Sequence, residues 1–354
     1  MAEIPKKLQE DILSEYLKEN GLRRIHQGKV RDTYSLADEK LLVLASARIS
    51  IFDFVLNALI PKKGEVLTAI THFWLTKVLD NFEHHLIRSV GNPRLNAVHD
   101  LHEMLPELPI ERCLVVKNLK SKLYPFEMIF RHYIGGSVFK KYQETSMVGG
   151  YKLPANLPKW SKLEKPILTP STKEEVGHDI NVDTEYFFKT MEEKGQKNEA
   201  IRVVKMLAEA YAIACTYAEE KDILILDTKF EVAGLTIVDE ILTPDSSRFT
   251  LKADWEKAMQ EGRDPQFLDK QPVRDWGSKI ETIFSREGKR VIGINNLNPE
   301  NEVHLSYVHG LEVPKEIIED TTKRYLNLFE LITGQNLKFY QTTKMGVKLQ
   351  NCML

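Results

Sequence analysis

Cysteine is scarce in this 354-residue sequence, and the scarcity excludes two common ways of holding a protein together. The three cysteines, Cys113, Cys215 and Cys352, lie far apart, and none belongs to a Cys-x-x-Cys pair. Neither a disulfide framework nor a zinc site is therefore expected. A reducing, cytoplasmic location fits this cysteine usage.

An excess of charge of one sign is also lacking, and so is an apolar segment at the N-terminus. The 49 basic and 51 acidic residues leave a net charge of −2, whereas a nucleic-acid-binding protein usually has a strongly basic face. Residues 1–10 are polar and contain lysine, so neither a signal peptide nor a membrane span is expected there. We therefore predict no nucleic acid and no membrane as partner, and a local basic pocket for a small phosphorylated ligand stays compatible with the composition.

Short strand-like runs fill the first part of the sequence, and longer helical patterns fill the second part. In the first part, hydrophobic periodicity and turn residues predict a helix over 7–20, strands over 22–26, 30–36 and 41–45, a helix over 66–79, and strands over 112–119 and 126–134. In the second part, they predict a long loop over 144–173, helices over 181–194 and 198–221, and a hairpin over 223–242. An irregular stretch over 281–312 and a helix over 315–333, closed by Gly334, complete the prediction. Strands do not alternate regularly with helices, which disfavours a doubly wound sheet and predicts an α+β fold.

A glycine loop between the first two of these strands is the first candidate binding segment. Gly28 lets backbone N–H groups approach an anion closely, and Lys29 beside Val30 adds a positive charge for a phosphate. The alternative is a plain glycine turn with exposed charges.

Three polar residues, Arg48, Ser50 and Asp53, interrupt the apolar stretch over 41–60. Polar groups in such a stretch need partners if they are buried. They form either a rim that faces a ligand or an internal salt bridge between Arg48 and Asp53, and the spacing favours neither.

Two further segments combine small or hydroxylated residues with a cation. Arg131 precedes Gly135-Gly136-Ser137 at the start of a helix predicted over 138–143, which suits a phosphate monoester, although Ser137 could be a simple N-cap. Thr169-Pro-Ser-Thr-Lys173 is followed by Gly-His-Asp179, either a carboxylate-binding loop or an ordinary capped loop.

The hairpin has one apolar face and one charged face, because strand side chains alternate. Asp227, Lys229 and Glu231 share the charged face. With a three-residue loop over 233–235, Asp239 is expected opposite Lys229 and diagonal to Glu231. Two carboxylates and a lysine suit magnesium and nucleotide phosphates, and solvated surface charges are the alternative. A turn beyond the hairpin delivers Arg248, a second anion-binding candidate.

The ordered set of segments resembles the SAICAR synthetase family over residues 21–337. The motifs are Gly-Lys-Val-Arg-Asp at 28–32, Arg-Ile-Ser at 48–50, Arg-His-Tyr-Ile-Gly-Gly-Ser at 131–137, Thr-Pro-Ser-Thr-Lys at 169–173, Leu-Asp-Thr-Lys-Phe-Glu at 226–231 and Asp-Glu-Ile-Leu-Thr-Pro-Asp-Ser-Ser-Arg-Phe at 239–249. The resemblance implies a two-lobed fold related to ATP-grasp proteins and protein kinases, with ATP between the lobes. Residues 1–118 would form an antiparallel-sheet N-terminal lobe with the phosphate-binding glycine loop, and residues 119–354 a mixed α/β C-terminal lobe with the metal and substrate site.

The resemblance also implies a function: an ATP-dependent ligase of purine synthesis that joins carboxyaminoimidazole ribotide (CAIR) to L-aspartate, with magnesium. A small-molecule kinase at the same MgATP site is the alternative enzyme, and a nucleotide-binding regulatory protein without turnover is the alternative of another class. By position, the resemblance assigns ATP binding to Gly28, Lys29, Val30, Lys117 and Lys229, catalysis to Lys229, Glu231 and Asp239, and magnesium binding to Glu231 and Asp239. It assigns the ribotide phosphate to Arg131, Gly136, Ser137 and Arg248, and the imidazole and ribose to Arg48, Ser50 and Asp53. It assigns the aspartate or the reacting carboxylate to Lys173 and Asp179.

Three positions depart from the family pattern. Ala47 stands where an acidic residue is usual, and His132 and Gly135 replace the glycine and threonine of the usual Arg-Gly-Tyr-x-Thr-Gly-Ser motif. Arg131, Gly136 and Ser137 keep the rest of that motif intact.

Overall fold

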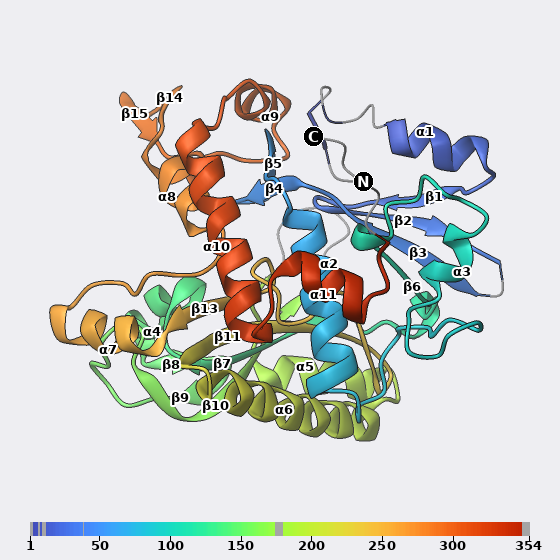
Figure 1. Ribbon diagram of the computed structural model, residues 1–354. Coiled ribbons are helices and arrows are strands. Elements are labelled where there is room, and N and C mark those ends of the chain that lie inside the picture. Colours follow the sequence, from blue (N-terminus) through green and yellow to red (C-terminus); the bar gives the residue numbers. More distant parts are fainter. Residues whose placement is uncertain (1–2, 6–7, 9–11, 38, 174–179, 349–354) are drawn as a thin grey trace. The chain divides into compact units, whose positions relative to one another are not determined.

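The computed structural model (Figure 1) describes residues 3–5, 8, 12–37, 39–173 and 180–348. The contacts within the chain group it into two compact units. The first unit comprises residues 1–69, 86–118 and 269–354, and the second unit comprises residues 70–85 and 119–268. Both units combine helices with antiparallel strand pairs, which confirms the α+β class.

An antiparallel sheet of four strands, in the order β1-β2-β3-β6, organises the first unit. Its strands are β1 (Arg24–Gln27), β2 (Arg31–Ser35), β3 (Lys40–Ala45) and β6 (Cys113–Lys117). Leu42 and Leu44 of β3 are buried against Val115 of β6 and Tyr34 of β2 in a hydrophobic core. Alternating burial along β2 and β3 therefore explains why these runs form strands, and the predicted meander is confirmed.

A second core of the first unit joins a hairpin to helices from the last third of the chain. The hairpin consists of β4 (Arg48–Ile51) and β5 (Phe54–Leu59). Apolar residues of both strands pack with Val273, Ile294 and Val308. The other elements of the first unit are α1 (Ile12–Glu19), α3 (Val98–His102), η3 (Ile110–Arg112), α8 (Gln271–Lys279), β14 (Glu281–Arg286), β15 (Lys289–Ile292), η6 (Ile294–Asn296), α9 (Glu302–His309), α10 (Lys315–Thr333) and α11 (Leu337–Lys344).

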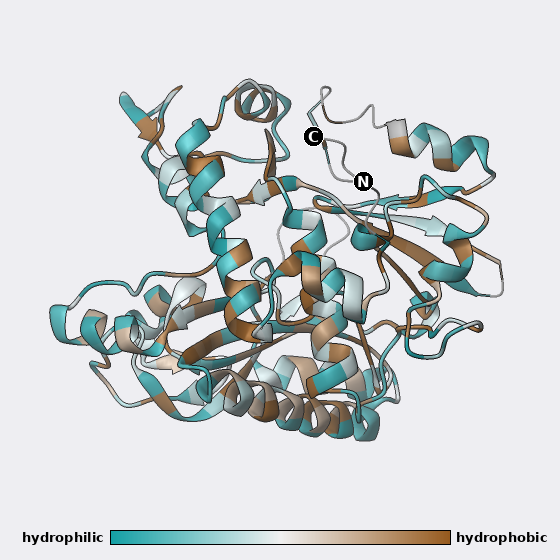
Figure 2. Ribbon diagram, viewed as in Figure 1, coloured by the Kyte–Doolittle hydropathy of each residue, from teal (hydrophilic) through white to brown (hydrophobic). Residues whose placement is uncertain are grey.

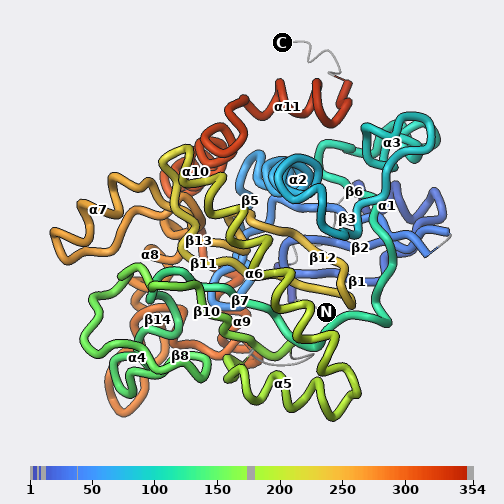
Figure 3. The backbone as a smooth tube through the Cα atoms, turned by 90° about the horizontal axis from the view of Figure 1, so that it is seen from below, coloured from blue at the N-terminus to red at the C-terminus, as the bar shows by residue number. Residues whose placement is uncertain are grey.

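A five-stranded sheet organises the second unit, with the order β10-β7-β11-β12 and with β13 also paired to β11. The strands are β7 (Phe126–Tyr133), β10 (Lys162–Thr172), β11 (Ile223–Ala233), β12 (Thr236–Val238) and β13 (Ser247–Leu251). Helices α5 (Thr184–Glu193) and α6 (Lys197–Glu219) contact β10 and β11 and lie along one face of this sheet (Figures 1 and 3). Figure 2 shows hydrophobic residues, in brown, along its strands. The remaining elements are η4 (Lys120–Lys122), η5 (Gly136–Val138), α4 (Phe139–Thr145), β8 (Met147–Val148), β9 (Tyr151–Lys152) and α7 (Lys252–Glu261).

The helix predicted over 66–79 is α2 (Lys63–Phe73), which continues as the π-helical turn η2 (Trp74–Val78). The helices predicted over 181–194 and 198–221 are confirmed as α5 and α6. The last long helix, α10, ends at Gly334, whose φ of +70° provides the left-handed helix end that was predicted.

Two stretches that were predicted to be irregular contain regular elements. Residues 144–173 were predicted to be a loop, yet they contain β8, β9 and the long strand β10. The two prolines within β10, Pro166 and Pro170, are tolerated because β10 is an edge strand, where a missing N–H need not break a ladder. Residues 281–312 were also predicted irregular, and they form the hairpin β14–β15 and helix α9.

Candidate active site

A lysine held among carboxylates is the main feature of the charged face of β11. The Lys229 ammonium group lies 2.6 Å from a Glu127 carboxylate oxygen and 3.3 Å from a Glu231 oxygen. The second Glu231 oxygen accepts a hydrogen bond of 2.5 Å from Lys173, which follows β10. Antiparallel pairing of Lys229 with Ile129 brings the β7 residue Glu127 beside it. Three adjacent strands thus deliver one cluster of alternating charge.

The electrostatics of this cluster favour the charged form of the lysine. Burial lowers the pKa of Lys229, but the nearby carboxylates of Glu231, Glu127 and Asp239 outweigh it and raise the pKa well above its usual value. Lys229 therefore stays a cation at every physiological pH.

The register of the hairpin differs from the predicted one. Glu231 pairs with Val238 and Ala233 pairs with Thr236, so the connection is shorter than the three-residue loop that was predicted. Gly234 makes the shorter turn possible, because its φ is +57° and tight hairpin turns need such a residue. Asp239 leaves the strand with φ +65°, and its charge still acts on Lys229.

Glu127 was missed by the sequence analysis, although a signal for it exists. Along β7, Met128 and Phe130 are buried on one face, and Glu127 alternates with them on the other face together with Arg131. Glu127 lies four residues before Arg131, a residue already predicted to bind a ligand. Because side chains alternate along a strand, the two lie on the same face.

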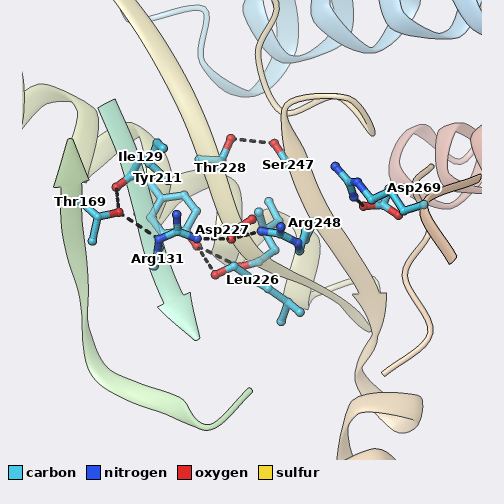
Figure 4. A network of polar contacts seen from close by, with 12 residues as sticks. Ile129, Arg131, Thr169, Tyr211, Leu226, Asp227, Thr228, Ser247, Arg248 and Asp269 are labelled. Carbon is cyan, nitrogen blue, oxygen red and sulfur yellow. Dashed lines mark hydrogen bonds and ion pairs between the residues drawn. The ribbon is translucent and has the colours of Figure 1, made fainter. Parts of the chain in front are cut away.

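Two arginines converge on Asp227 in the middle of the same sheet (Figure 4). Arg131 donates a 2.6 Å hydrogen bond and Arg248 a 2.5 Å hydrogen bond to the same Asp227 oxygen. The convergence follows from pairing, because Asp227 lies opposite Arg131 of β7 on one side and opposite Arg248 of β13 on the other. These two arginines and one aspartate carry one net positive charge, which favours the binding of an anion.

The two arginines differ in exposure. Arg131 is 3% exposed and also donates to the Thr169 hydroxyl at 2.9 Å. Burial lowers the pKa of Arg131, and Asp227 opposes that shift. The Arg248 side chain is 24% exposed, so Arg248 is the member of the pair that can meet a ligand, with Arg131 beneath it.

The glycine-serine segment lies against Arg248. Gly136 has φ +64°, and a Cβ atom there would lie 2.9 Å from the Arg248 Nη1, so only glycine suits this position. Ser137 follows at an exposed position in η5, and no side-chain hydrogen bond caps η5 or α4. The simple N-cap interpretation of Ser137 is therefore wrong.

In the first unit, Arg48 holds the glycine loop through hydrogen bonds to its backbone. Its guanidinium donates to both Asp32 oxygens, at 2.6 and 3.2 Å, and to the carbonyl oxygens of Gly28 and Lys29, each at 3.2 Å. Lys29 pairs with Asp53 at 2.5 Å. The internal Arg48–Asp53 salt bridge, one of the two alternatives, is thus not the pairing that forms.

The remaining predicted residues are placed as follows. Ser50 is buried in β4, Val30 is half-buried beside the glycine loop, and Lys117 is exposed at the end of β6. Asp179, with its neighbour His178, lies outside the described residues.

The site residues therefore fall into three groups by position. The first unit holds Gly28, Lys29, Val30, Arg48, Ser50, Asp53 and Lys117; the second unit holds one cluster of Lys173, Lys229, Glu231 and Asp239 and another of Arg131, Gly136, Ser137 and Arg248. Among the residues that the structure describes, no three His, Cys, Asp or Glu side chains form a ready metal-ligand group. No helix in the described part of the chain is long and apolar enough to cross a membrane.

Comparisons with known proteins identify the family of this chain. A model of the SAICAR synthetase family matches residues 24–291. The phosphoribosylaminoimidazole-succinocarboxamide synthase of Actinobacillus succinogenes is 38% identical over 323 residues, covering 89% of this chain and 99% of that protein. The enzyme of the same name from Thermobifida fusca is 35% identical and covers 90% of this chain and 94% of that protein.

Solved structures point the same way. The SAICAR synthase of Saccharomyces cerevisiae, solved in complex with SAICAR, superposes with a TM-score of 0.69 at 30% identity, covering 89% of this chain and 96% of that one. A SAICAR synthetase solved in complex with ADP shares the fold, with a TM-score of 0.56 at 18% identity, covering 88% of this chain and 98% of that one. The resemblance inferred from the ordered motifs is thus confirmed, and this chain belongs to the SAICAR synthetase family.

Proposed function

We propose that the three groups of site residues serve the reaction of this family, the ATP-dependent condensation of CAIR with L-aspartate to SAICAR, ADP and phosphate in purine biosynthesis. The observation that carries the proposal is the cluster around Lys229, whose ammonium group contacts Glu127 and Glu231 on one face of a sheet and is also influenced by the charge of Asp239. Such a face can hold both the phosphates of ATP and a divalent cation.

The glycine loop and two lysines are assigned to ATP. Gly28 and Val30 would approach the phosphates through backbone groups, with Lys29 adding a positive charge. The hydrogen bonds from Arg48 to the carbonyl oxygens of residues 28 and 29 support this role, because they hold the loop in one conformation. Lys117 would lie on the adenine side, and Lys229 would contact a phosphate.

Magnesium is assigned to Glu231 and Asp239. The donor set fits this ion, since magnesium prefers oxygen ligands, usually takes one or two protein carboxylates and completes its shell with phosphate oxygens and water. A bound ion would neutralise phosphate charge. The contacts of Glu231 with Lys173, at 2.5 Å, and with Lys229, at 3.3 Å, support the assignment, because both of its oxygens face cations.

The phosphate of CAIR is assigned to the cluster at Asp227. Arg248, the backbone of Gly136 and the Ser137 hydroxyl would contact the phosphate, with Arg131 acting through Asp227 because it is buried behind it. Ser50 and Asp53 are assigned to the imidazole and ribose, with Arg48 positioning that segment. Lys173 and Asp179 are assigned to aspartate or to the reacting carboxylate.

The chemistry requires no protein nucleophile. The CAIR carboxylate oxygen attacks the γ-phosphorus of ATP, which releases ADP and forms an acyl phosphate. The aspartate amine then attacks the acyl carbon, phosphate leaves with the C–O bond electrons, and the amine loses a proton. Catalysis of this kind rests on positioning the reactants and on neutralising charge. Lys229, a lasting cation, suits the second role.

We also propose a two-lobed architecture for this chain. A two-lobed arrangement of the ATP-grasp and protein-kinase type, with nucleotide-phosphate binding within residues 1–118 and metal and substrate binding within residues 119–354, would serve this reaction. Residues 269–354 group with the first unit and carry none of the assigned roles.

One assay tests the proposal. Purified protein is incubated with MgATP, CAIR and aspartate, and ADP and SAICAR are followed together. We expect both products in equal amounts and dependence on aspartate. Release of ADP with a phosphorylated product and without aspartate would indicate the small-molecule kinase instead, and no turnover under any condition would contradict both enzymes.

A further inference from the structure

A buried tryptophan lies beside the arginine that we assign to the substrate phosphate. The Trp160 side chain belongs to the segment before β10 and is 2% exposed. The Cζ atom of Arg248 lies 5.7 Å from the centre of its ring, within the range of a cation–π interaction. None of the roles assigned above involves Trp160.

The surrounding structure holds Trp160 firmly in place. Its backbone adopts φ +67°, which is unusual for a bulky residue and persists only where neighbouring contacts impose it. Its indole N–H donates to Asp264 at 3.0 Å, its backbone N–H donates to the Ile134 carbonyl at 2.7 Å, and its carbonyl accepts from Trp255 at 2.9 Å. Two backbone hydrogen bonds and one indole hydrogen bond thus fix Trp160, and a ring held in this way can hold its neighbour in turn.

Gly135 makes room for the ring. A Cβ atom on Gly135 would lie 2.2 Å from a ring carbon of Trp160. The backbone of Gly135 is extended, with φ −166°, a conformation that any residue adopts. The glycine is therefore needed for space alone, and Trp160 fills the space that a side chain at position 135 would occupy.

A position over an aromatic face suits an arginine that binds an anion. The contact with the ring uses none of the guanidinium N–H donors, which can hydrogen-bond to acceptors. Asp227 accepts one of these N–H groups, and Gly136 lies against the same guanidinium. The aromatic ring, the carboxylate and the glycine together define one orientation for Arg248.

We propose that Trp160 is a positioning residue for recognition of the substrate phosphomonoester, because it holds Arg248 against Gly136 in its phosphate-binding orientation. The inference rests on the proposed assignment of Arg248 to the ribotide phosphate. It adds a residue pair, Trp160 with Gly135, that determines how tightly the ribotide binds without touching it.

Steady-state kinetics of Trp160→Leu, with each substrate varied in turn, test the proposal. We expect KM for CAIR to rise about fivefold to tenfold, as loss of a partly desolvated cation–π contact predicts. KM for ATP and for aspartate should change by less than about twofold, because an unrelated site keeps its contacts. Trp160→Phe keeps an aromatic face and should restore most of the CAIR affinity.

A second variant tests the contact from the other side. Gly135→Ala keeps the tryptophan but displaces its ring, so it should raise KM for CAIR in the wild-type background. The same change in the Trp160→Leu background should have almost no further effect. Fully additive effects would contradict the proposal. If Trp160→Leu fails to fold, Gly135→Ala and Trp160→Phe still decide the matter.

Arg248→Ala separates this inference from the function on which it rests. If Arg248→Ala leaves KM for CAIR unchanged, the assigned phosphate site is wrong. If Arg248→Ala raises it while Trp160→Leu does not, the phosphate site holds and the role of Trp160 is overturned. Lys165→Ala is the control, since Lys165 is an exposed lysine of the neighbouring strand β10, and it should leave KM for CAIR unchanged.

Discussion

Lys229 is the residue whose surroundings most directly predict an effect on catalysis. Glu127 holds its ammonium group at 2.6 Å and contributes to its raised pKa. Replacing Glu127 by Gln removes that charge and the orientation it gives, so we expect kcat to fall about 10-fold to 100-fold, as for other groups that orient a site residue. Steady-state kinetics measure it, with the exposed Glu164→Gln as control. An unchanged kcat would exclude a role for Glu127.

Asp239 carries a separate prediction. Its backbone at φ +65° turns it out of the hairpin, and its charge acts on Lys229. Asp239→Asn should raise the magnesium concentration needed for half-maximal activity and lower turnover, because a neutral amide is a poor magnesium ligand. Titration of activity with magnesium gives the answer, with circular dichroism confirming the fold. Unaffected activity would show that the hairpin was misassigned.

The two carboxylates near the glycine loop should differ in their effect on stability. Asp32 and Arg48 form a buried pair, with side chains 3% and 5% exposed. Asp32→Asn leaves a buried guanidinium without its counter-charge, so we expect a loss of about 3–5 kcal/mol in the free energy of unfolding. Asp53→Asn breaks an exposed pair with Lys29 and should cost less than about 1 kcal/mol. Urea denaturation compares them, and equal losses would contradict the argument.

This pair of carboxylates also shows what residue spacing can and cannot predict. Arg48 was correctly singled out as a polar group that needs a partner. The partner is Asp32, whereas Asp53 is nearer in sequence. Asp53 is turned elsewhere because Phe52 and Asp53 both adopt positive φ at the β4–β5 turn, a conformation that spacing does not reveal.

At the scale of elements, hydrophobic patterns predicted strands and helices well wherever the pattern was strong. The buried alternation of β2 and β3, the apolar face of α6 and the charged face of β11 were all predictable. Edge strand β10 was missed because its prolines are turn signals in a sequence and are tolerated at a sheet edge. The register of the β11–β12 hairpin depends on the conformation of one glycine, which no pattern encodes.

That glycine carries a prediction for the hairpin as an element. Gly234 has φ +57°, and a Cβ atom there would meet only Glu199 Oε2, at 3.9 Å. Gly234→Ala should therefore destabilise the protein through backbone strain alone, by about 1–2 kcal/mol. Gly91 likewise has one neighbour, at 3.9 Å, but no positive φ, so Gly91→Ala should be neutral or slightly stabilising. Chemical denaturation measures both, and equal effects would contradict the strain argument.

At the scale of the whole chain, the grouping of distant segments was the least predictable feature. Residues 269–354 join the first unit because Val273, Ile294 and Val308 share a core with Ile49 and Phe54, which lie far earlier in the sequence. Local periodicity marks these residues as apolar without naming their partners. The ordered motifs predicted the family and its chemistry. They consist of the residues expected to bind ligands, whereas the residues that pack the core lie largely outside them.

The pH dependence of stability is the prediction that belongs to the whole molecule. Burial lowers the pKa of His99, His132 and His309 below the usual value, so the folded protein binds fewer protons at these sites than the unfolded chain. Stability from these groups is complete above the unfolded pKa of about 6.5 and is lost as pH falls through the lower folded pKa values. Urea denaturation should give a free energy of unfolding that falls by about 1 kcal/mol or more between about pH 7.5 and about pH 5.5. His132→Gln removes one of the three groups and should reduce that fall, whereas an identical pH dependence in the variant and the wild type would show that His132 titrates alike in both states.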